Sequence, residues 1–299
     1  MTTLKPSGST APAPATTAAS EIDTANLPEL GPDSILWQRF GDWRSMFVAL
    51  SAGVLQIAQR DISRSLVQQS NVFDNEVARL VRSAFPIIRT VYEGPEVGAM
   101  IRDFHKDIKG THPDGTRYHS LNPEVYYWAH ATFVDQVLYI TDTFIRRLSY
   151  AEKVQIFEES KVWYQLYGVS DRGQPQTYEE FVQYWEDMLD RFVPHKTIVY
   201  ATGYIRQGLP RPKKIPAPVW KILSLPLNAF IRTVVVGTLP QQMRDVCDLE
   251  WNDRREKNFQ RFAALMRAAN PLINRLPLKY LYVPWAYDAW RKVGIDPRP

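Results

Sequence analysis

Four of the five histidines in this 299-residue chain lie between positions 105 and 130. They are His105, His112, His119 and His130. Arg102 and Lys106 stand close to the first of them. Imidazole is the commonest protein metal ligand and titrates near neutral pH, while cations beside an apolar pocket can bind dioxygen, a carboxylate or a propionate. The stretch is therefore the first place to look for metal or acid–base chemistry.

His130 lies on a helix that the sequence predicts to begin at Asn122-Pro123-Glu124, where Asn caps, proline suits the first turn and the acid suits the helix dipole. Apolar side chains share its face at helical spacing. They are Tyr126, Tyr127, Phe133, Val134 and Val137. A buried, flat, apolar cofactor requires such a histidine from its proximal helix. The alternative is a core histidine that bonds a backbone carbonyl, and the spacing leaves both open.

Arg102, His105 and Lys106 occupy positions i, i+3 and i+4 of a helix predicted over 95–109, so they project together beside its apolar stripe. They could contact a ligand on its distal side, or form a solvated basic edge completed by Lys109. His112 and His119 fall in a loop or small hairpin over 111–121, where we expect surface exposure.

Several other kinds of site lack support. The spacing H-x6-H-x6-H-x10-H contains no zinc motif, although Asp135 and Glu124 could complete a mixed site. No dinucleotide, Walker, nucleophile-elbow or CxxC motif occurs, which disfavours Rossmann hydride transfer and phosphoryl transfer. The lone Cys247 excludes an intrachain disulfide, suits a reducing, cytoplasmic compartment, and is interpreted as a small buried hydrophobe.

The composition is that of a soluble globular protein, with 45% hydrophobic and 23% charged residues. A net charge of +4 is too small to argue for nucleic acid. Residues 1–27 are rich in Ala, Pro and Thr, show no export signal and are predicted to be a disordered arm. The apolar run 46–58 is shorter than the roughly 20 residues of a membrane span, so we interpret it as a core helix.

Helical patterns cover almost all of residues 28–299, which we expect to form one all-α domain. Capping boxes at Ser149–Glu152 and Thr177–Glu180 open two of the helices. A proline-rich connector is predicted over 206–220. The helices are expected over 34–58, 74–92 with a break or kink at Pro86, 95–109, 123–147, 150–167, 178–193, 219–270 and 283–293.

Several segments together resemble the MpaB-type oxygenase family, which includes the rubber-cleaving latex-clearing proteins. The likeness covers about residues 34–255, and the pairing of R-x-x-H-K with the downstream W-A-H-A-T is fairly specific. The segments are LQIAQRDISRSLVQQSNVFDNEVARLVRSAFPIIRTVYEG from Leu55, R-x-x-H-K-x-I-K-G at 102–110, NPEVYYWAHATFVD at 122–135 and LPLNAFIRTVVVGTLPQQMRDVCDLEW at 225–251.

The resemblance implies an all-helical, globin-like core around haem b. It places the proximal iron ligand at His130 and a distal arginine at Arg102. In the rubber oxygenases lysine and threonine follow that arginine at +3 and +4, whereas this chain has His105 and Lys106. His105 could therefore be a sixth iron ligand or a distal acid or base. Family members act on substrates as different as polyisoprene and prenylated small molecules.

Three hypotheses follow. The first is a haem-dependent oxygenase that uses dioxygen on an apolar small molecule, by cleavage of a carbon–carbon double bond, hydroxylation or peroxide-driven oxidation. The second is a non-catalytic haem protein, a sensor, carrier or electron-transfer protein, with both His105 and His130 on the iron. The third is a helical scaffold or peripheral membrane protein without a cofactor, in which RQGLPRPKKIP at 206–216 contacts acidic lipids.

Overall fold

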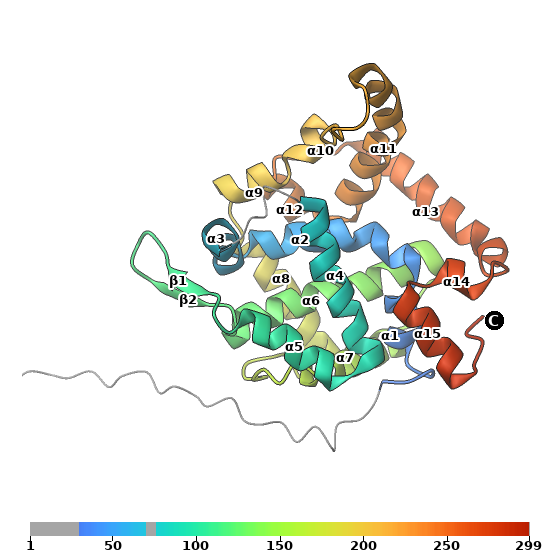
Figure 1. Cartoon of the computed structure of the whole chain (residues 1–299), viewed down its shortest axis with the longest axis horizontal. Helices are drawn as coiled ribbons and strands as arrows, with labels where there is room; N and C mark the ends of the chain where they lie inside the picture. Colours follow the sequence, from blue (N-terminus) through green and yellow to red (C-terminus); the bar gives the residue numbers. More distant parts are fainter. Residues whose placement is uncertain (1–29, 70–75, 299) are drawn as a thin grey trace, which may run out of the picture.

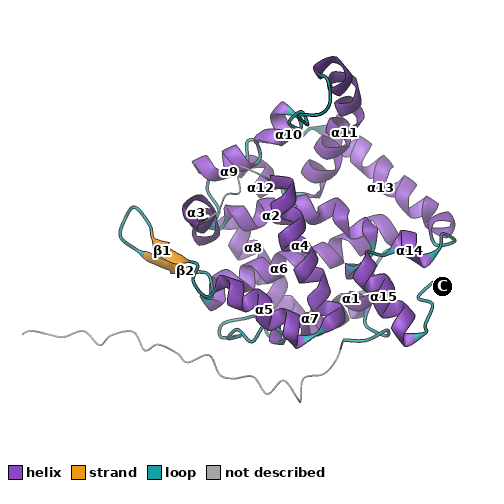
Figure 2. Ribbon diagram, viewed as in Figure 1, coloured by secondary structure: helices purple, strands orange, loops and turns teal. Residues whose placement is uncertain are grey.

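The computed structural model describes residues 30–69 and 76–298, and the predicted disordered arm lies outside them. The described chain is predominantly helical, as predicted (Figure 1, Figure 2). The elements of its first third are α1 (Ile35–Phe40), the 3-10 turn η2 (Trp43–Ser45), α2 (Met46–Ala58), α3 (Arg60–Gln69), α4 (Glu76–Glu93) and α5 (Pro95–His105).

The predicted helix over 34–58 is wrong as one element, because the chain breaks after α1. The carboxylate of Asp42 is buried and accepts a hydrogen bond from the backbone N–H of Arg44 at 2.9 Å, which caps η2. The same carboxylate bonds the Arg44 guanidinium. In contrast, α4 runs through Pro86 without a break.

A two-stranded antiparallel hairpin separates α5 from the next helix, as the turn residues predicted. Strand β1 (Lys109–Thr111) pairs with β2 (Arg117–His119), with Gly110 opposite Tyr118. The helix predicted to Lys109 ends four residues earlier because the backbone of Lys109 joins this strand pair. The hairpin extends away from the helices at the left of Figure 1.

The central helices form largely as their caps predicted. They are α6 (Pro123–Ile140), the π-helical turn η3 (Thr141–Ile145), α7 (Tyr150–Gln165) and α8 (Tyr178–Asp190). The N-terminus of α7 has a complete capping box between Ser149 and Glu152. At α8 the Thr177 hydroxyl caps the helix, but the Glu180 carboxylate accepts from the backbone N–H of Gln176, so that box is only half formed.

The last third contains several short helices that the sequence pattern did not predict. These are α9 (Lys196–Ala201), α10 (Gly203–Gln207) and α14 (Leu278–Leu281). A further short helix, α12 (Gln241–Val246), lies inside the 219–270 stretch that was predicted to be helical. Between them lie α11 (Ala217–Thr238) and α13 (Asp253–Ile273), and α15 (Pro284–Val293) closes the domain close to its predicted bounds. The proline-rich connector is non-helical over 208–216.

The main hydrophobic core lies around α6, whose side chains contact α2 and α7. Trp128 is fully buried and its indole N–H donates to the carbonyl of Leu55 on α2 at 3.0 Å. Val48, Ala52 and Leu55 are buried, which confirms α2 as a core helix. Among the described helices, α11 is long and apolar enough to cross a membrane by length and composition alone.

Candidate functional site

His130 is buried inside a shell of aromatic rings from α6 and α7. Its side chain is 3% exposed. The ring centroids of Trp163 and Tyr164 lie 4.6 and 5.1 Å from that of His130. Those of Tyr127 and Tyr167 each lie 6.0 Å away. The predicted aromatic face of α6 is therefore completed by a second helix.

Only one nitrogen of this imidazole is paired. Nε2 donates to the backbone carbonyl of Ser160 at 3.1 Å, so Nδ1 carries the lone pair. Nδ1 is buried and has no hydrogen-bond partner among the residues that the structure describes. Because burial removes water from the charged form, the pKa of His130 is lowered to about 3. The ring is neutral at physiological pH, as a metal-ligating imidazole must be.

The donor chemistry of His130 fits an iron ligand. A metal-bound histidine commonly donates its second ring N–H to a backbone carbonyl, and the Ser160 contact has that form. A core histidine would make the same bond, but it would not leave a buried acceptor unpaired at a cost in free energy. The close packing around His130 opposes cofactor binding. The rings of Trp163 and Tyr167 pack against the imidazole and must move to admit a planar group.

The cations of α5 share one acid at the protein surface. Nε of Arg102 lies 3.0 Å and Nζ of Lys106 lies 2.9 Å from the same Oδ1 of Asp103. Hydrogen bonds from Lys106 and Arg102 lower the pKa of Asp103. Arg102 is half-buried and Lys106 is exposed, so Lys106 forms part of the solvated edge that was the alternative interpretation.

His105 and His130 are connected by ring contacts through three tyrosines. We call Tyr126, Tyr164 and Tyr167 the tyrosine layer. The ring of His105 packs edge-on against Tyr126 at 5.8 Å, and its Nδ1–H donates to the Ile101 carbonyl at 2.7 Å. Tyr126 in turn contacts Tyr167 at 5.5 Å and Tyr164 at 6.1 Å. Burial raises the pKa of all three phenols, which therefore stay protonated.

The other predicted cofactor contacts lie on the same helix at different distances from His130. Phe133 reaches it indirectly, through a ring contact with Trp163 at 6.0 Å. Val134 is fully buried in the core. Tyr127 lines a cavity of about 310 Å³ at the N-terminus of α6, together with Glu124 and Arg191. Tyr127 is thus the side chain between this cavity and the imidazole.

The expected exposure of His112 and His119 is wrong. His112 is buried, and its Nε2 lies 2.8 Å from Oδ1 of Asp61 on α3, 51 residues earlier in the chain. His119 is half-buried and its Nε2 donates to the carbonyl of Lys106 at 3.0 Å. Both rings hold the hairpin against helices, so their role here is structural.

Sequence reasoning missed the partners that α7 supplies to His130. The signal was present in the spacing of Tyr167, which follows Trp163 at i+4 and Tyr164 at i+3. It also missed Asp103, whose single carboxylate forms ion pairs with two of the predicted distal cations.

A zinc site has no support among residues 30–69 and 76–298, where no group of three or more His, Cys, Asp or Glu side chains could hold a metal ion. Cys247 is fully buried, and burial raises the pKa of its thiol to about 12. The interpretation of Cys247 as a buried hydrophobe is confirmed.

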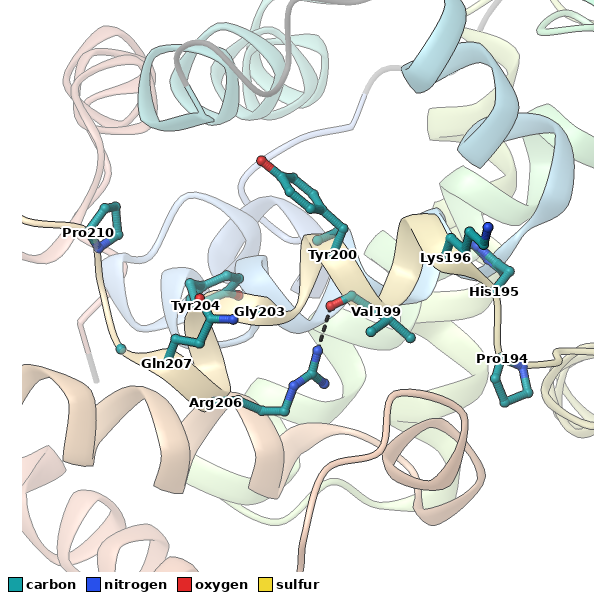
Figure 3. A pocket seen from close by; sticks show the side chains of 12 residues that line it. Pro194, His195, Lys196, Val199, Tyr200, Gly203, Tyr204, Arg206, Gln207 and Pro210 are labelled. Carbon is teal, nitrogen blue, oxygen red and sulfur yellow. Dashed lines mark hydrogen bonds between the residues drawn. The ribbon is translucent and has the colours of Figure 1, made fainter.

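A larger cavity of about 830 Å³ lies over α9 and α10, away from His130 (Figure 3). Its lining includes Lys196, Tyr200, Tyr204 and Arg206. The guanidinium of Arg206 donates to the carbonyls of Val199 and Cys247, so this cation is already paired with backbone. His195 also lines the cavity, and its Nε2 is buried without a partner among the described residues. Because Nδ1 of His195 accepts from the backbone N–H of Ile198 at 3.3 Å, that Nε2 carries the proton, whereas the unpaired nitrogen of His130 carries a lone pair.

Comparison with known proteins tests the family resemblance that was seen in the sequence. No curated protein and no solved structure matched the chain. The family model described as "ER-bound oxygenase mpaB/B'/Rubber oxygenase, catalytic domain" matches residues 37–268, which is most of the chain and includes both α5 and α6. This protein therefore belongs to the MpaB and rubber oxygenase catalytic-domain family.

Proposed function

We propose that the protein is a haem b-dependent oxygenase in which His130 is the proximal iron ligand and the substrate is an apolar small molecule. Membership of an oxygenase catalytic-domain family supports the reaction class. The observation that carries the ligand assignment is Nδ1 of His130, which is buried, neutral and without a partner in the described part of the chain.

Haem iron, when bound, would supply the activation of dioxygen. The protein's own residues set the environment. The Ser160 carbonyl holds the imidazole in one tautomer and orientation. The aromatic rings around His130 exclude water, which strengthens any electrostatic contact inside the shell.

Arg102 is the group proposed to stabilise negative charge on the distal side. It lies close enough to Tyr126 for its charge to oppose the rise in that phenol's pKa, so it faces the tyrosine layer as well as Asp103. A guanidinium at this edge could donate to bound oxygen or to a propionate. His105, whose ring contacts Tyr126, is the proposed distal acid or base.

An absorption spectrum of the purified protein tests the proposal, taken oxidised, then reduced with dithionite, then under CO. We expect a Soret band that shifts with CO. His130→Ala should lose haem, while the matched change His119→Ala, at a half-buried histidine of the hairpin, should retain it. Stoichiometric haem in His130→Ala, or no Soret band after reconstitution of the wild type, would refute the assignment.

The same spectrum distinguishes the proposed oxygenase from the alternative of a non-catalytic haem protein. A Soret band that does not respond to CO would indicate that His105 and His130 fill both axial positions. That arrangement requires the two rings to approach one iron, whereas each ring now packs against members of the tyrosine layer.

A further inference from the structure

The N-terminal half of α11 exposes apolar side chains to solvent. Ile222 is 70% exposed and Leu225 is 64% exposed. Leu223, Leu227 and Val219 are exposed as well. The C-terminal half of the same helix, from Ile231 onward, is buried in the main core. Exposed apolar surface of this extent marks a contact site.

The exposed half is held in place by its own connector. The indole N–H of Trp220 donates to the carbonyl of Leu209 at 3.3 Å. The side-chain oxygen of Asn228 accepts from the backbone N–H of Leu209 at 2.9 Å. Trp220, the buried Ser224 and Asn228 share one face of α11, and the connector covers this face. In Figure 1 this part of α11 stands clear of the body at the top of the molecule.

The apolar surface is wide rather than a narrow stripe. At 100° per residue, Leu225, Ile222, Leu223 and Leu227 cover an arc of about 200° around the helix. A protein groove recognises a helix through one row of anchors at i, i+3, i+4 and i+7. An arc this wide suits immersion in a fluid apolar phase instead.

Charge is strongly segregated around the same elements. Residues 191–244 contain nine Lys and Arg and no Asp or Glu. The other 245 residues contain 27 Lys and Arg and 32 Asp and Glu, a net charge of −5. Three exposed lysines lie at the N-terminal end of α11, namely Lys213, Lys214 and Lys221. The exposed apolar surface is therefore bordered by exposed lysines, and positive charge complements an anionic lipid surface.

We propose that residues 217–230 of α11, with the connector 208–216, form a docking surface for the face of an anionic membrane. The fourteen residues extend about 21 Å, less than the roughly 30 Å of a bilayer core. Since the rest of α11 packs in the protein core, the helix lies in the interface and does not span. The apolar side chains enter the acyl boundary while the lysines contact lipid phosphates.

Co-sedimentation of the full chain with vesicles tests this surface independently of haem. The probes are phosphatidylcholine vesicles with and without about 30 mol% phosphatidylserine. We expect binding to the anionic vesicles that weakens in about 0.5 M salt. Lys213→Glu with Lys214→Glu should lower the partition coefficient about tenfold or more. Ile222→Ser with Leu225→Ser should reduce it comparably.

The control variants make the same kinds of substitution at exposed positions outside α11 and its connector. Lys279→Glu with Lys292→Glu reverses two exposed charges on α14 and α15, and Leu272→Ser alters a side chain that is 66% exposed on α13. Both controls should bind like the wild type, with circular dichroism reporting the fold of each variant. Hydrogen exchange should localise lipid-induced protection to 208–230.

Three results would overturn the proposal. The wild type would fail to bind anionic vesicles, or the α11 and control variants would bind equally well. Alternatively, ultracentrifugation without lipid would show self-association that Ile222→Ser with Leu225→Ser abolishes, which would assign the helix to a second copy of the chain.

Discussion

Nε2 of His130 on α6 donates to the backbone carbonyl of Ser160 on α7 at 3.1 Å, and this contact leaves Nδ1 buried and unpaired in the described structure. One hydrogen bond between neighbouring helices thus determines the tautomer of the imidazole and which of its nitrogens could bind iron. The energetic cost of that arrangement makes the histidine testable without any cofactor.

His130 should make the haem-free protein sensitive to acid. Its pKa in the folded state lies at about 3, below the ordinary value near 6.5, so its contribution to stability is present above pH 6.5 and lost as the pH falls. At pH 5 the lowered pKa reduces the free energy of unfolding by about 2 kcal/mol relative to pH 7.5. Urea unfolding at pH 7.5 and 5.0 should show a smaller loss of stability in His130→Leu than in the wild type. Equal losses would contradict a neutral buried imidazole.

Arg102→Ala should keep haem but slow oxidation, because the side chain is proposed to act on bound oxygen and not on the iron. We expect oxygen consumption with polyisoprene or a prenylated small molecule to fall about tenfold to a hundredfold, less than for a fully buried oxyanion donor. Arg102→Lys should recover only part of it, since lysine lacks the planar fork. Arg117→Ala, an exposed arginine of the hairpin, is the control, and unchanged turnover in Arg102→Ala would exclude its role.

Gly98→Ala should destabilise the protein because α5 touches the end of α7 at this position. A Cβ on Gly98 would collide with the backbone carbonyl of Leu166, which cannot rotate away. We expect a loss of about 1–3 kcal/mol in the free energy of unfolding. Gly53→Ala is the matched control in α2, where a Cβ meets nothing within 4 Å, and it should stabilise by up to about 1 kcal/mol. The same sign for both changes would refute this account of the contact.

Asp135→Asn should stabilise the protein more at high pH than at low pH. Burial raises the pKa of this carboxyl to about 7, so the folded state resists its ionisation and stability is lost as the pH rises from about 4 to 7. Since Asp135 is only partly buried, we expect the gain to be about 1–2 kcal/mol larger at pH 8 than at pH 5. Chemical denaturation at both pH values measures it, and a gain independent of pH would contradict the raised pKa.

Local sequence determined where many helices begin, because their caps are hydrogen bonds between residues two to four positions apart. Asn122 caps α6 and the Ser149–Glu152 box caps α7 as predicted. The position of the last helix, α15, was also predicted from the local sequence pattern. The family resemblance, whose motifs lie within residues 55–135 and 225–251, pointed to the correct family.

Contacts between segments far apart in the sequence decided which side chains are buried and which partners they have. The burial of His112 depends on Asp61. The shell around His130 depends on Trp163 and Tyr164 of α7 and on Tyr167 just after it, about thirty to forty residues later in the chain. The two halves of α11 have similar composition, yet only the second half meets the core. Periodicity states which side chains share a helix face, but which face is covered depends on how the helices pack. Only the tertiary structure therefore paired the Ser160 carbonyl with His130 and left one imidazole nitrogen without a partner among the residues that the structure describes.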